Sequence, residues 1–299
     1  MTTSLPAAAD VAAAATAIRP YVRRTPLMRV TVDGRPLVLK LEHLQLGGSF
    51  KLRGATNALL SGERPGRVVT ASGGNHGLGV ATAARLLGIP ATVYTPRSVP
   101  EAKARRIIAA GAELIRHGDT YAEAADAARA VTGARYLPAY DDPAVIAGQG
   151  TVAAEVVEEA PEVDAVVVAA GGGGLAAGTA LAIGDRACVV AEPEHCRSVH
   201  AALEAGGPVD VPVDSVAASA LGATRIGEAP FAVLSTARTV PVLVPDAEIV
   251  AARDRLWEDF RLAVEPAAAV PLAAWLGGRF DAELPCLVLC GANADWSPS

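Results

Sequence analysis

Lysine is scarce in this chain, with only Lys40, Lys51 and Lys103 among its 299 residues. Lys103 lies in a charged, alanine-rich run typical of an exposed helix face. Lys40 lies in a strand-like run, where we expect its ammonium group to reach a sheet edge. Lys51 follows a glycine pair and opens a helical segment, so it is the best placed of the three to point into a cleft. A lysine captures a carbonyl only as a free amine in a partly desolvated site. We therefore interpret Lys51 as a candidate nucleophile, against the alternative of an ordinary exposed helix lysine.

Cysteine is also scarce. The four cysteines, Cys188, Cys196, Cys286 and Cys290, are too few to form a disulfide framework in a chain of this length. Neither pair has the two-residue spacing of a zinc knuckle. We therefore expect reduced thiols, a cytoplasmic protein and no structural metal.

Basic clusters and long apolar runs are missing. The formal net charge is −6, and no basic patch is interleaved with aromatic residues, which argues against nucleic-acid binding. No apolar run reaches the roughly 20 residues that span a bilayer. The N-terminal stretch lacks a basic start followed by an apolar core, so no signal peptide is expected. With 51% hydrophobic residues, the chain has enough apolar side chains for a large core. These features favour a globular protein without a membrane-spanning segment or a nucleic-acid-binding surface.

Strand and helix patterns alternate along most of the chain. Strands are predicted at residues 37–41, 67–72, 91–94, 113–116, 164–170, 187–192 and 285–290. Helices are predicted at residues 8–22, 51–60, 78–87, 101–110, 121–131, 142–159, 246–262 and 266–276, with another that ends near residue 183. A looser region precedes residue 246. Strands separated by single helices imply right-handed crossovers and largely parallel sheets with helices on both faces.

The alternating pattern therefore predicts an α/β fold with two doubly wound, mostly parallel domains and a cleft between them. We predict a large domain of residues 1–71 and 142–299, and a small domain of residues 72–141. In such sheets ligands bind at the carboxyl ends of the strands. Four predicted strand ends carry distinctive residues, at positions 72–76, 171–174, 192 and 290–293.

Four consecutive glycines, Gly171, Gly172, Gly173 and Gly174, follow an apolar strand and open a helix. Glycines allow the backbone to approach an anion, and the helix N-terminus supplies free N–H groups and a positive dipole. This arrangement favours a phosphate site over a tight turn without a ligand. Gly172, Gly174 and Ala177 also fit a dinucleotide-binding spacing, with Glu192 where a ribose-binding carboxylate is expected. A nicotinamide enzyme therefore stays open, although that function leaves Lys51 unused.

The loop from Ser72 through Gly73 to Asn75 and His76 joins another strand to a helix. Its backbone N–H groups, hydroxyl and amide suit a second anion, such as a substrate carboxylate. Asn75 can donate to a phenolate-type oxygen, whereas His76 alone could simply be a histidine at a helix start. Cys290 ends the last strand and could be a buried core thiol. Taken together, a phosphate site, an amine in a cleft, an amide and a weak donor indicate pyridoxal 5'-phosphate.

The sequence resembles the fold-type II pyridoxal-phosphate enzymes, which share the tryptophan synthase β-like fold, and within them the serine/threonine dehydratases. The likeness covers nearly the whole chain and rests on seven blocks in the family's order. These blocks are RTPL (24–27), LKLEHLQLGGSFKLRGA (39–55), TASGGNHG (70–77), DDPAVIAGQGT (141–151), GGGGLAAG (171–178), EP (265–266) and LCGAN (289–293).

The resemblance implies a role for each candidate residue. Lys51 would form the Schiff base with the cofactor and take the Cα proton of the substrate. In the resemblance, the cofactor phosphate would bind at Gly171, Gly172, Gly173 and Gly174. Phe50 would pack against the cofactor ring, Asn75 would bind the ring hydroxyl and Cys290 would face the ring nitrogen. The substrate carboxylate would be held by Ser72, Gly73, Asn75 and His76.

Two departures from the family pattern narrow the implied activity. Serine racemases of the family carry a serine as second-face base where this chain has Gly73, so racemization is not expected. Metal-binding relatives have a carboxylate shortly after a Glu-Pro pair, but Glu192 and its proline are followed by Cys196 and Ser198. We therefore expect no divalent metal site.

The resulting prediction is a cytoplasmic ammonia-lyase that converts L-threonine or L-serine to a 2-oxo acid and ammonia by β-elimination. The open alternatives are a hydroxyaspartate dehydratase or a β-replacement synthase on the same scaffold, a nicotinamide oxidoreductase, and a non-catalytic pyridoxal-binding protein. Relatives in the family are often dimers, so a homodimer is compatible with the resemblance.

Overall fold

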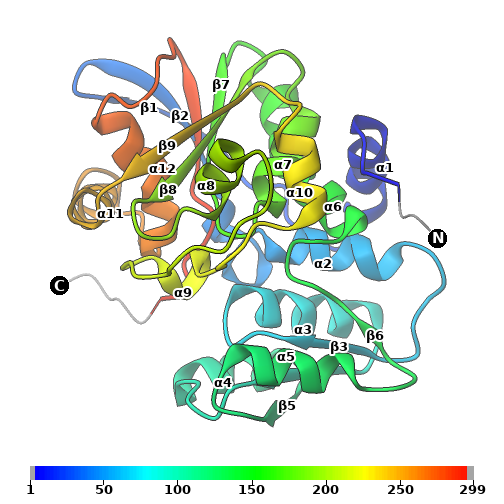
Figure 1. The fold of residues 1–299 in the computed structure, drawn as a ribbon. Coiled ribbons are helices and arrows are strands. Elements are labelled where there is room, and N and C mark those ends of the chain that lie inside the picture. The colour runs from blue at the N-terminus through cyan, green and yellow to red at the C-terminus, as the bar shows by residue number, and fades with distance from the viewer. Residues whose placement is uncertain (1–3, 295–299) are drawn as a thin grey trace.

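The computed structural model describes residues 4–294, and its strands form two sheets. The larger sheet has the order β1 (Leu27–Val32), β2 (Arg35–Lys40), β10 (Pro285–Val288), β7 (Ala165–Ala169), β8 (Ala187–Pro193) and β9 (Thr239–Val244) (Figure 1). Only the hairpin of β1 and β2 is antiparallel; the other pairs are parallel. The smaller sheet is wholly parallel, with the order β5 (Glu113–Arg116), β4 (Ala91–Thr95), β3 (Val68–Ala71) and β6 (Arg135–Tyr136). Two mostly parallel α/β sheets confirm the predicted fold class.

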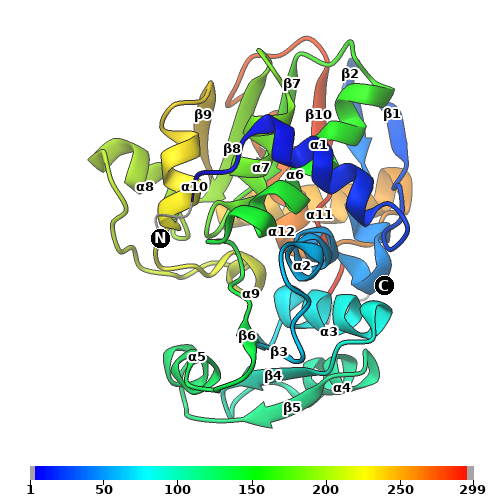
Figure 2. The same ribbon diagram turned by 90° about the vertical axis from the view of Figure 1, so that its right-hand side faces the viewer.

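Helices cover the larger sheet on both faces. Helix α12 packs on its central strands with α11 outside it, while α7, α6 and α1 form layers on the opposite face (Figure 1). Helix α2 packs against both α6 and α3 and so lies between the two sheets (Figure 2). The α-helices are α1 Ala8–Ile18, α2 Lys51–Leu60, α3 Asn75–Leu87, α4 Glu101–Ala109, α5 Tyr121–Arg129, α6 Pro143–Glu159, α7 Gly174–Ala182, α8 Ser198–Ala205, α9 Ala218–Leu221, α10 Glu228–Leu234, α11 Asp246–Phe260 and α12 Pro266–Leu276.

Local sequence signals explain several of these boundaries. Strand β7 is wholly buried, as expected for an all-apolar strand inside a parallel sheet. Asp142 caps α6 by accepting a hydrogen bond from the Val145 N–H, with Pro143 in the first turn. Thr120 and Glu123 form a capping box at the start of α5. Each signal lies within a few residues of the boundary it sets, which is why these helices could be predicted.

The looser region before residue 246 proved to be structured. It contains α8, α9, α10 and the edge strand β9. The sequence did not predict β9, because Pro241 lies inside it. Proline has no backbone N–H to donate to a neighbouring strand, so it argues against a strand. An edge strand tolerates this, since its outer side has no partner.

The position predicted for Lys40 at a sheet edge was wrong. Strand β2 lies between β1 and β10, and the Lys40 side chain is fully buried. Its Nζ donates to Glu155 Oε2 at 2.6 Å and to the Thr25 carbonyl at 2.8 Å. Arg53, also buried, pairs with Glu42 and Glu155, at 2.6 and 2.7 Å. We call Lys40, Glu42, Arg53 and Glu155 the buried ion cluster; it ties β2 to α2 and α6.

The predicted domain division assigns β3 to the large domain, because its boundary falls between residues 71 and 72. The strand partners of β3 are β4 and β6, which belong to the smaller sheet. We propose that the small domain begins with β3, while the division between residues 141 and 142 stays a prediction.

Candidate active site

Lys51 is the first residue of α2, and pairing with the end of the larger sheet holds it in place. The Phe50 N–H donates to the Cys290 carbonyl at 3.1 Å, and Ser49 forms an isolated antiparallel bridge with Gly291. Residues 49–51 therefore lie beside residues 290–291, which come directly after β10. The structure thus brings Cys290 next to Phe50 and Lys51, which precede it by about 240 residues in the sequence.

The environment of the Lys51 amine suits a nucleophile. Its Nζ donates to the Ala139 carbonyl at 2.8 Å and lies 5.1 Å from the centre of the Phe50 ring. Desolvation lowers the pKa of Lys51 to about 8, and the nearby Cys290 only partly opposes this effect. Much more of the amine is therefore unprotonated near neutral pH than in an exposed lysine.

The four glycines form a tight loop between β7 and α7. Gly173 is the N-cap of α7 and has a φ of +87°, a backbone angle that residues with a side chain rarely adopt. A Cβ on Gly172 would lie 2.3 Å from the Tyr140 ring, and one on Gly171 would lie 3.0 Å from the Leu221 backbone. The loop therefore needs glycine for packing as well as for conformation. Its N–H groups at the N-terminus of α7 suit a phosphate group.

Tyr140 is absent from the sequence-based prediction, yet its ring packs on Gly172 and its backbone on Gly174. Its hydroxyl donates to the Arg225 carbonyl at 3.4 Å. No short motif marks this tyrosine, because its contacts lie more than 30 residues away in sequence. Together with Ala139, it places the segment from β6 to α6 against both the Lys51 amine and the glycine loop.

The loop after β3 is close-packed. The Ser72 hydroxyl accepts a hydrogen bond from the Gly74 N–H at 3.2 Å. A Cβ at Gly73 would lie 2.6 Å from Cγ2 of Val99, so this side of the loop is lined by an apolar side chain. The N-terminus of α3 follows directly, with backbone N–H groups that suit a carboxylate.

The imidazole of His76 is committed to the protein. Its Nε2 lies 3.1 Å from the Leu137 carbonyl, to which it donates. Burial, with a further effect of Lys51, lowers the pKa of His76 to about 3, so the ring is neutral. We therefore expect His76 to contribute its backbone N–H to substrate binding, with the ring as support.

Asn75 lies beside Gly291, the residue that follows Cys290 in the chain. Asn75 donates through Nδ2 to Glu265 at 2.7 Å and accepts through Oδ1 from Asn293 at 2.8 Å. Glu265 and Asn293 occur in two of the family-like sequence blocks but had no predicted role. The Cys290 side chain is buried, and desolvation raises its pKa, so it stays a neutral thiol. A neutral thiol can face a pyridine nitrogen without forcing its protonation.

The Glu192 carboxylate is hydrogen-bonded to the start of α8. Its buried carboxylate accepts hydrogen bonds from the backbone N–H groups of Val199 at 2.9 Å and His200 at 2.7 Å, and so caps α8. Burial raises its pKa to about 8. Within residues 4–294, no group of three or more His, Cys, Asp or Glu side chains could hold a metal ion. The absence of a divalent site at Glu192 stays a prediction.

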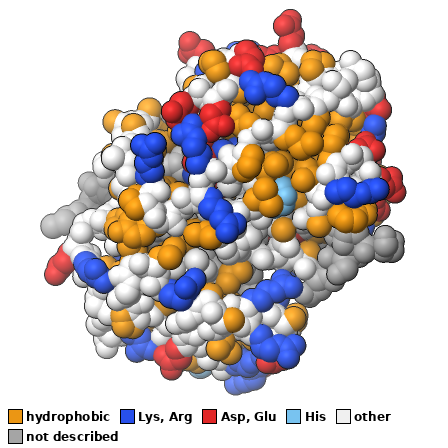
Figure 3. All heavy atoms as spheres, turned by 180° about the vertical axis from the view of Figure 1, so that it is seen from behind, with side chains coloured by type: hydrophobic (Ala, Val, Ile, Leu, Met, Phe, Trp, Pro, Cys, Tyr) orange, Lys and Arg blue, Asp and Glu red, His pale blue; other side chains and the backbone are white. Residues whose placement is uncertain are grey.

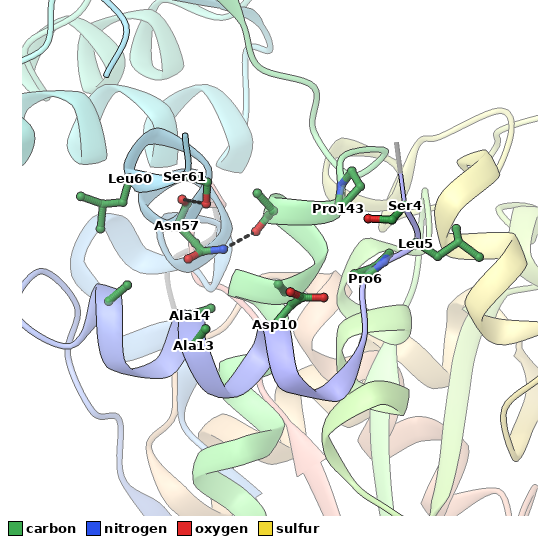
Figure 4. A pocket seen from close by; sticks show the side chains of 13 residues that line it. Ser4, Leu5, Pro6, Asp10, Ala13, Ala14, Asn57, Leu60, Ser61 and Pro143 are labelled. Carbon is green, nitrogen blue, oxygen red and sulfur yellow. Dashed lines mark hydrogen bonds between the residues drawn. The ribbon is translucent and has the colours of Figure 1, made fainter. Parts of the chain in front are cut away.

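A separate pocket of about 340 Å³ lies where α1, the end of α2 and the start of α6 meet (Figure 4). Asn57 and Ser61 line it, and Asn57 donates through Nδ2 to the Ala144 carbonyl at 2.8 Å. It includes none of the predicted site residues, so we do not assign it to the reaction.

The residues present fit pyridoxal phosphate: an activated amine, a glycine-lined anion loop, an amide donor and a neutral thiol. Comparison with known proteins agrees. Residues 18–291 match the family model described as pyridoxal-phosphate dependent enzyme. The crystal structure of a threonine deaminase from T.th. superposes with a TM-score of 0.92 at 36% identity, covering 98% of this chain and 100% of that one.

Curated relatives at similar identity carry different activities in their names. An L-threonine ammonia-lyase of Geobacter sulfurreducens is 39% identical, covering 93% of this chain and 73% of its own length. A serine racemase of Arabidopsis thaliana is 35% identical, with 93% and 90% covered. A beta-hydroxyaspartate dehydratase of Paracoccus denitrificans is 34% identical, with 97% of both chains covered. The nicotinamide alternative is therefore wrong: this chain belongs to the fold-type II family of pyridoxal-phosphate-dependent enzymes.

Proposed function

We propose that the protein is an ammonia-lyase that converts L-threonine, L-serine or both to a 2-oxo acid and ammonia. The observation that carries the proposal is the absence of a side chain at Gly73. A racemase needs a proton donor on the face of the substrate opposite the lysine, and Gly73 offers no side chain. Val99 packs against this glycine and adds no titratable group. One proton-transferring side chain, Lys51, favours elimination over proton exchange between two faces.

The residues of this chain supply binding and proton transfer. When bound, pyridoxal phosphate provides an aldehyde that captures the substrate amine and a ring that withdraws electrons from Cα. The glycine loop would hold its phosphate, and Asn75 and Cys290 would contact its ring. The N–H groups at the start of α3, with Ser72, would orient the substrate carboxylate. Lys51, released from the cofactor, would take the Cα proton.

Departure of the β-hydroxyl completes the reaction. The hydroxyl would take up one proton, which balances the proton that Lys51 removes from Cα, and would leave as water. The released enamine would become an imine that water hydrolyses to a 2-oxo acid and ammonia. A neutral thiol at Cys290 would not enforce protonation of the ring nitrogen, so the ring would be a weaker electron sink than one paired with a carboxylate. That favours a reaction in which the leaving group removes negative charge at once.

Product analysis tests this proposal. The purified enzyme should be incubated with L-threonine, L-serine and 3-hydroxyaspartate, with and without a thiol acceptor, and assayed for ammonia, 2-oxo acid, thioether and D-amino acid. Ammonia and 2-oxo acid in equal amounts from threonine or serine, without D-serine, are expected. Dominant D-serine would establish a racemase, dominant turnover of hydroxyaspartate a different dehydratase, and a thioether product a β-replacement synthase.

We also propose a cytoplasmic homodimer. No helix among residues 4–294 is long and apolar enough to cross a membrane. From behind, hydrophobic side chains gather on the upper part of the molecule around a histidine (Figure 3), and Leu5 and Leu44 are among the exposed large apolar residues. Sedimentation analysis distinguishes a dimer from a monomer.

A further inference from the structure

Asn75 is one link in a continuous chain of hydrogen bonds. Asn293 Nδ2 donates to the Gly47 carbonyl at 2.7 Å and to Asn75 Oδ1 at 2.8 Å. Asn75 Nδ2 in turn donates to Glu265 Oε1 at 2.7 Å. The chain joins the loop before Lys51, the segment after β10, the start of α3 and the start of α12.

The groups at both ends of this chain fix the direction of both amides. A backbone carbonyl only accepts hydrogen bonds, and so does a carboxylate in its ionised form. Burial raises the pKa of Glu265 to about 7, so near neutral pH its carboxyl is ionised in part of the molecules, whereas the Gly47 carbonyl is an acceptor at every pH. Asn293 must therefore turn its NH₂ toward Gly47, and Asn75 must turn its NH₂ toward Glu265. If Asn75 were flipped alone, its NH₂ would meet the NH₂ of Asn293 and its oxygen would meet the carboxylate. Each flip leaves like groups facing one another in a buried site, which is costly.

The surrounding backbone is shaped to hold these side chains. A Cβ on Gly291 would lie 2.3 Å from Glu265 Oε1 and 3.3 Å from Asn75 Nδ2, and a Cβ on Gly48 would lie 2.8 Å from Asn293 Oδ1. The Glu265 N–H also donates to the Gly291 carbonyl at 3.1 Å. Glycine at these two places thus makes room for the hydrogen-bonded chain beside the Lys51 loop.

We propose that Glu265 and Asn293 are positioning residues that hold the Asn75 amide with its nitrogen as the donor to the cofactor ring. The assignment rests on the proposed contact between Asn75 and the ring hydroxyl. One N–H of Asn75 binds Glu265, and the second is directed to the phenolic oxygen of the ring. In the flipped orientation the amide would turn its oxygen toward that oxygen, and the contact would become repulsive.

Two single variants and their combination, which exchanges the carboxylate of Glu265 and the amide of Asn293, test the assignment. N293D puts an acceptor opposite Asn75 Oδ1, which forces Asn75 to flip and its oxygen to meet Glu265. E265Q alone keeps an oxygen that accepts from Asn75. The exchange variant E265Q/N293D has the same charge as the native chain. It satisfies a flipped Asn75 at both ends, because the new glutamine can donate and the new aspartate can accept.

The readouts are the affinity for pyridoxal phosphate, the absorbance spectrum of the bound cofactor and the melting temperature. N293D should weaken cofactor binding about tenfold to a hundredfold, shift the absorbance band and lower the melting temperature. E265Q should weaken binding by no more than about threefold. The exchange variant should regain part of the melting temperature lost in N293D, but neither the native affinity nor the native spectrum.

Two results would overturn the assignment. One is a folded N293D protein with native cofactor affinity and spectrum. The other is an exchange variant in which affinity and spectrum recover together with the melting temperature, since that would show a structural role only. If N293D alone does not fold, the exchange variant decides by the same two readouts. None of these outcomes depends on whether the native enzyme releases ammonia, so a failure of the ammonia-lyase proposal would be seen separately.

Discussion

Lys40 and Lys51 lie close together in the sequence, and the protein uses them in opposite ways. Lys40 is fully buried and donates to a carboxylate, Glu155, within the buried ion cluster. Lys51 donates to the Ala139 carbonyl, an uncharged acceptor, and desolvation lowers its pKa to about 8. A carboxylate holds the Lys40 ammonium in the protein core, whereas the Lys51 amine faces an uncharged carbonyl, and desolvation beside such a partner favours loss of its proton. We interpret Lys40 as a structural residue and propose Lys51 as the nucleophile.

The largest expected effect comes from K51A. We expect loss of the absorbance of the bound cofactor and a fall in turnover of at least about a thousandfold, because the variant lacks the only amine placed to form the Schiff base and move the Cα proton. Absorbance spectra and an ammonia assay check this. The far-ultraviolet circular dichroism should stay native. A K51A protein that keeps the cofactor band and turns over normally would refute the assignment of Lys51.

The matched change at the other lysine, K40M, should act on stability. Glu155 is partly exposed and keeps its pair with Arg53, so the variant loses one charged hydrogen bond and leaves no buried charge unpaired, at a cost of about 1.5–3 kcal/mol. Urea denaturation should show this loss in the free energy of unfolding. The folded fraction should retain the cofactor spectrum. A K40M protein that keeps native stability but binds no cofactor would show that Lys40 acts in cofactor binding and not in stability.

The lowered pKa of Lys51 should set the pH dependence of cofactor binding. The rate at which apoenzyme combines with pyridoxal phosphate should rise about tenfold per pH unit below pH 8 and level off above it, because the free-amine fraction of Lys51 follows its lowered pKa. Stopped-flow absorbance measures this rate. Free Nα-acetyl-lysine, with an ordinary pKa near ~10.4, is the control, and its rate should still be rising at pH 9. A midpoint for the enzyme near that of the control would show that Lys51 is not desolvated.

The smallest expected effect is a gain of function on the face opposite Lys51. G73S/V99A adds a hydroxyl where the native chain has none and removes the Val99 methyl groups that a Cβ would meet. We expect slow formation of D-serine from L-serine beside continued elimination, at a cost in stability of about 1–2 kcal/mol from the shortened Val99. Chiral chromatography detects the product. V99A is the control and should form none; D-serine from V99A alone would show that the proton comes from elsewhere.

The sequence by itself determined the parts of the protein that depend on near neighbours. The alternating apolar runs predicted the two parallel sheets, and α2 begins at Lys51 and ends at Leu60 as expected. The glycines at 171–174 and the loop after Ser72 could be found because each lies between a strand and a helix. Their chemistry rests on local backbone N–H groups and so is visible in a short stretch.

Only the tertiary structure decided which distant groups meet. Glu265 contacts Asn75 across 190 residues, and Tyr140 packs on the glycine loop from a segment of the chain without a local motif. The burial of Lys40 depends on β10, which joins the sheet beside β2 from the far end of the chain. A short sequence pattern does not reveal these pairings, because strand order and packing bring the partners together. The chemical groups are therefore readable in the sequence, whereas their counter-charges, and hence their reactivity, are set by the fold.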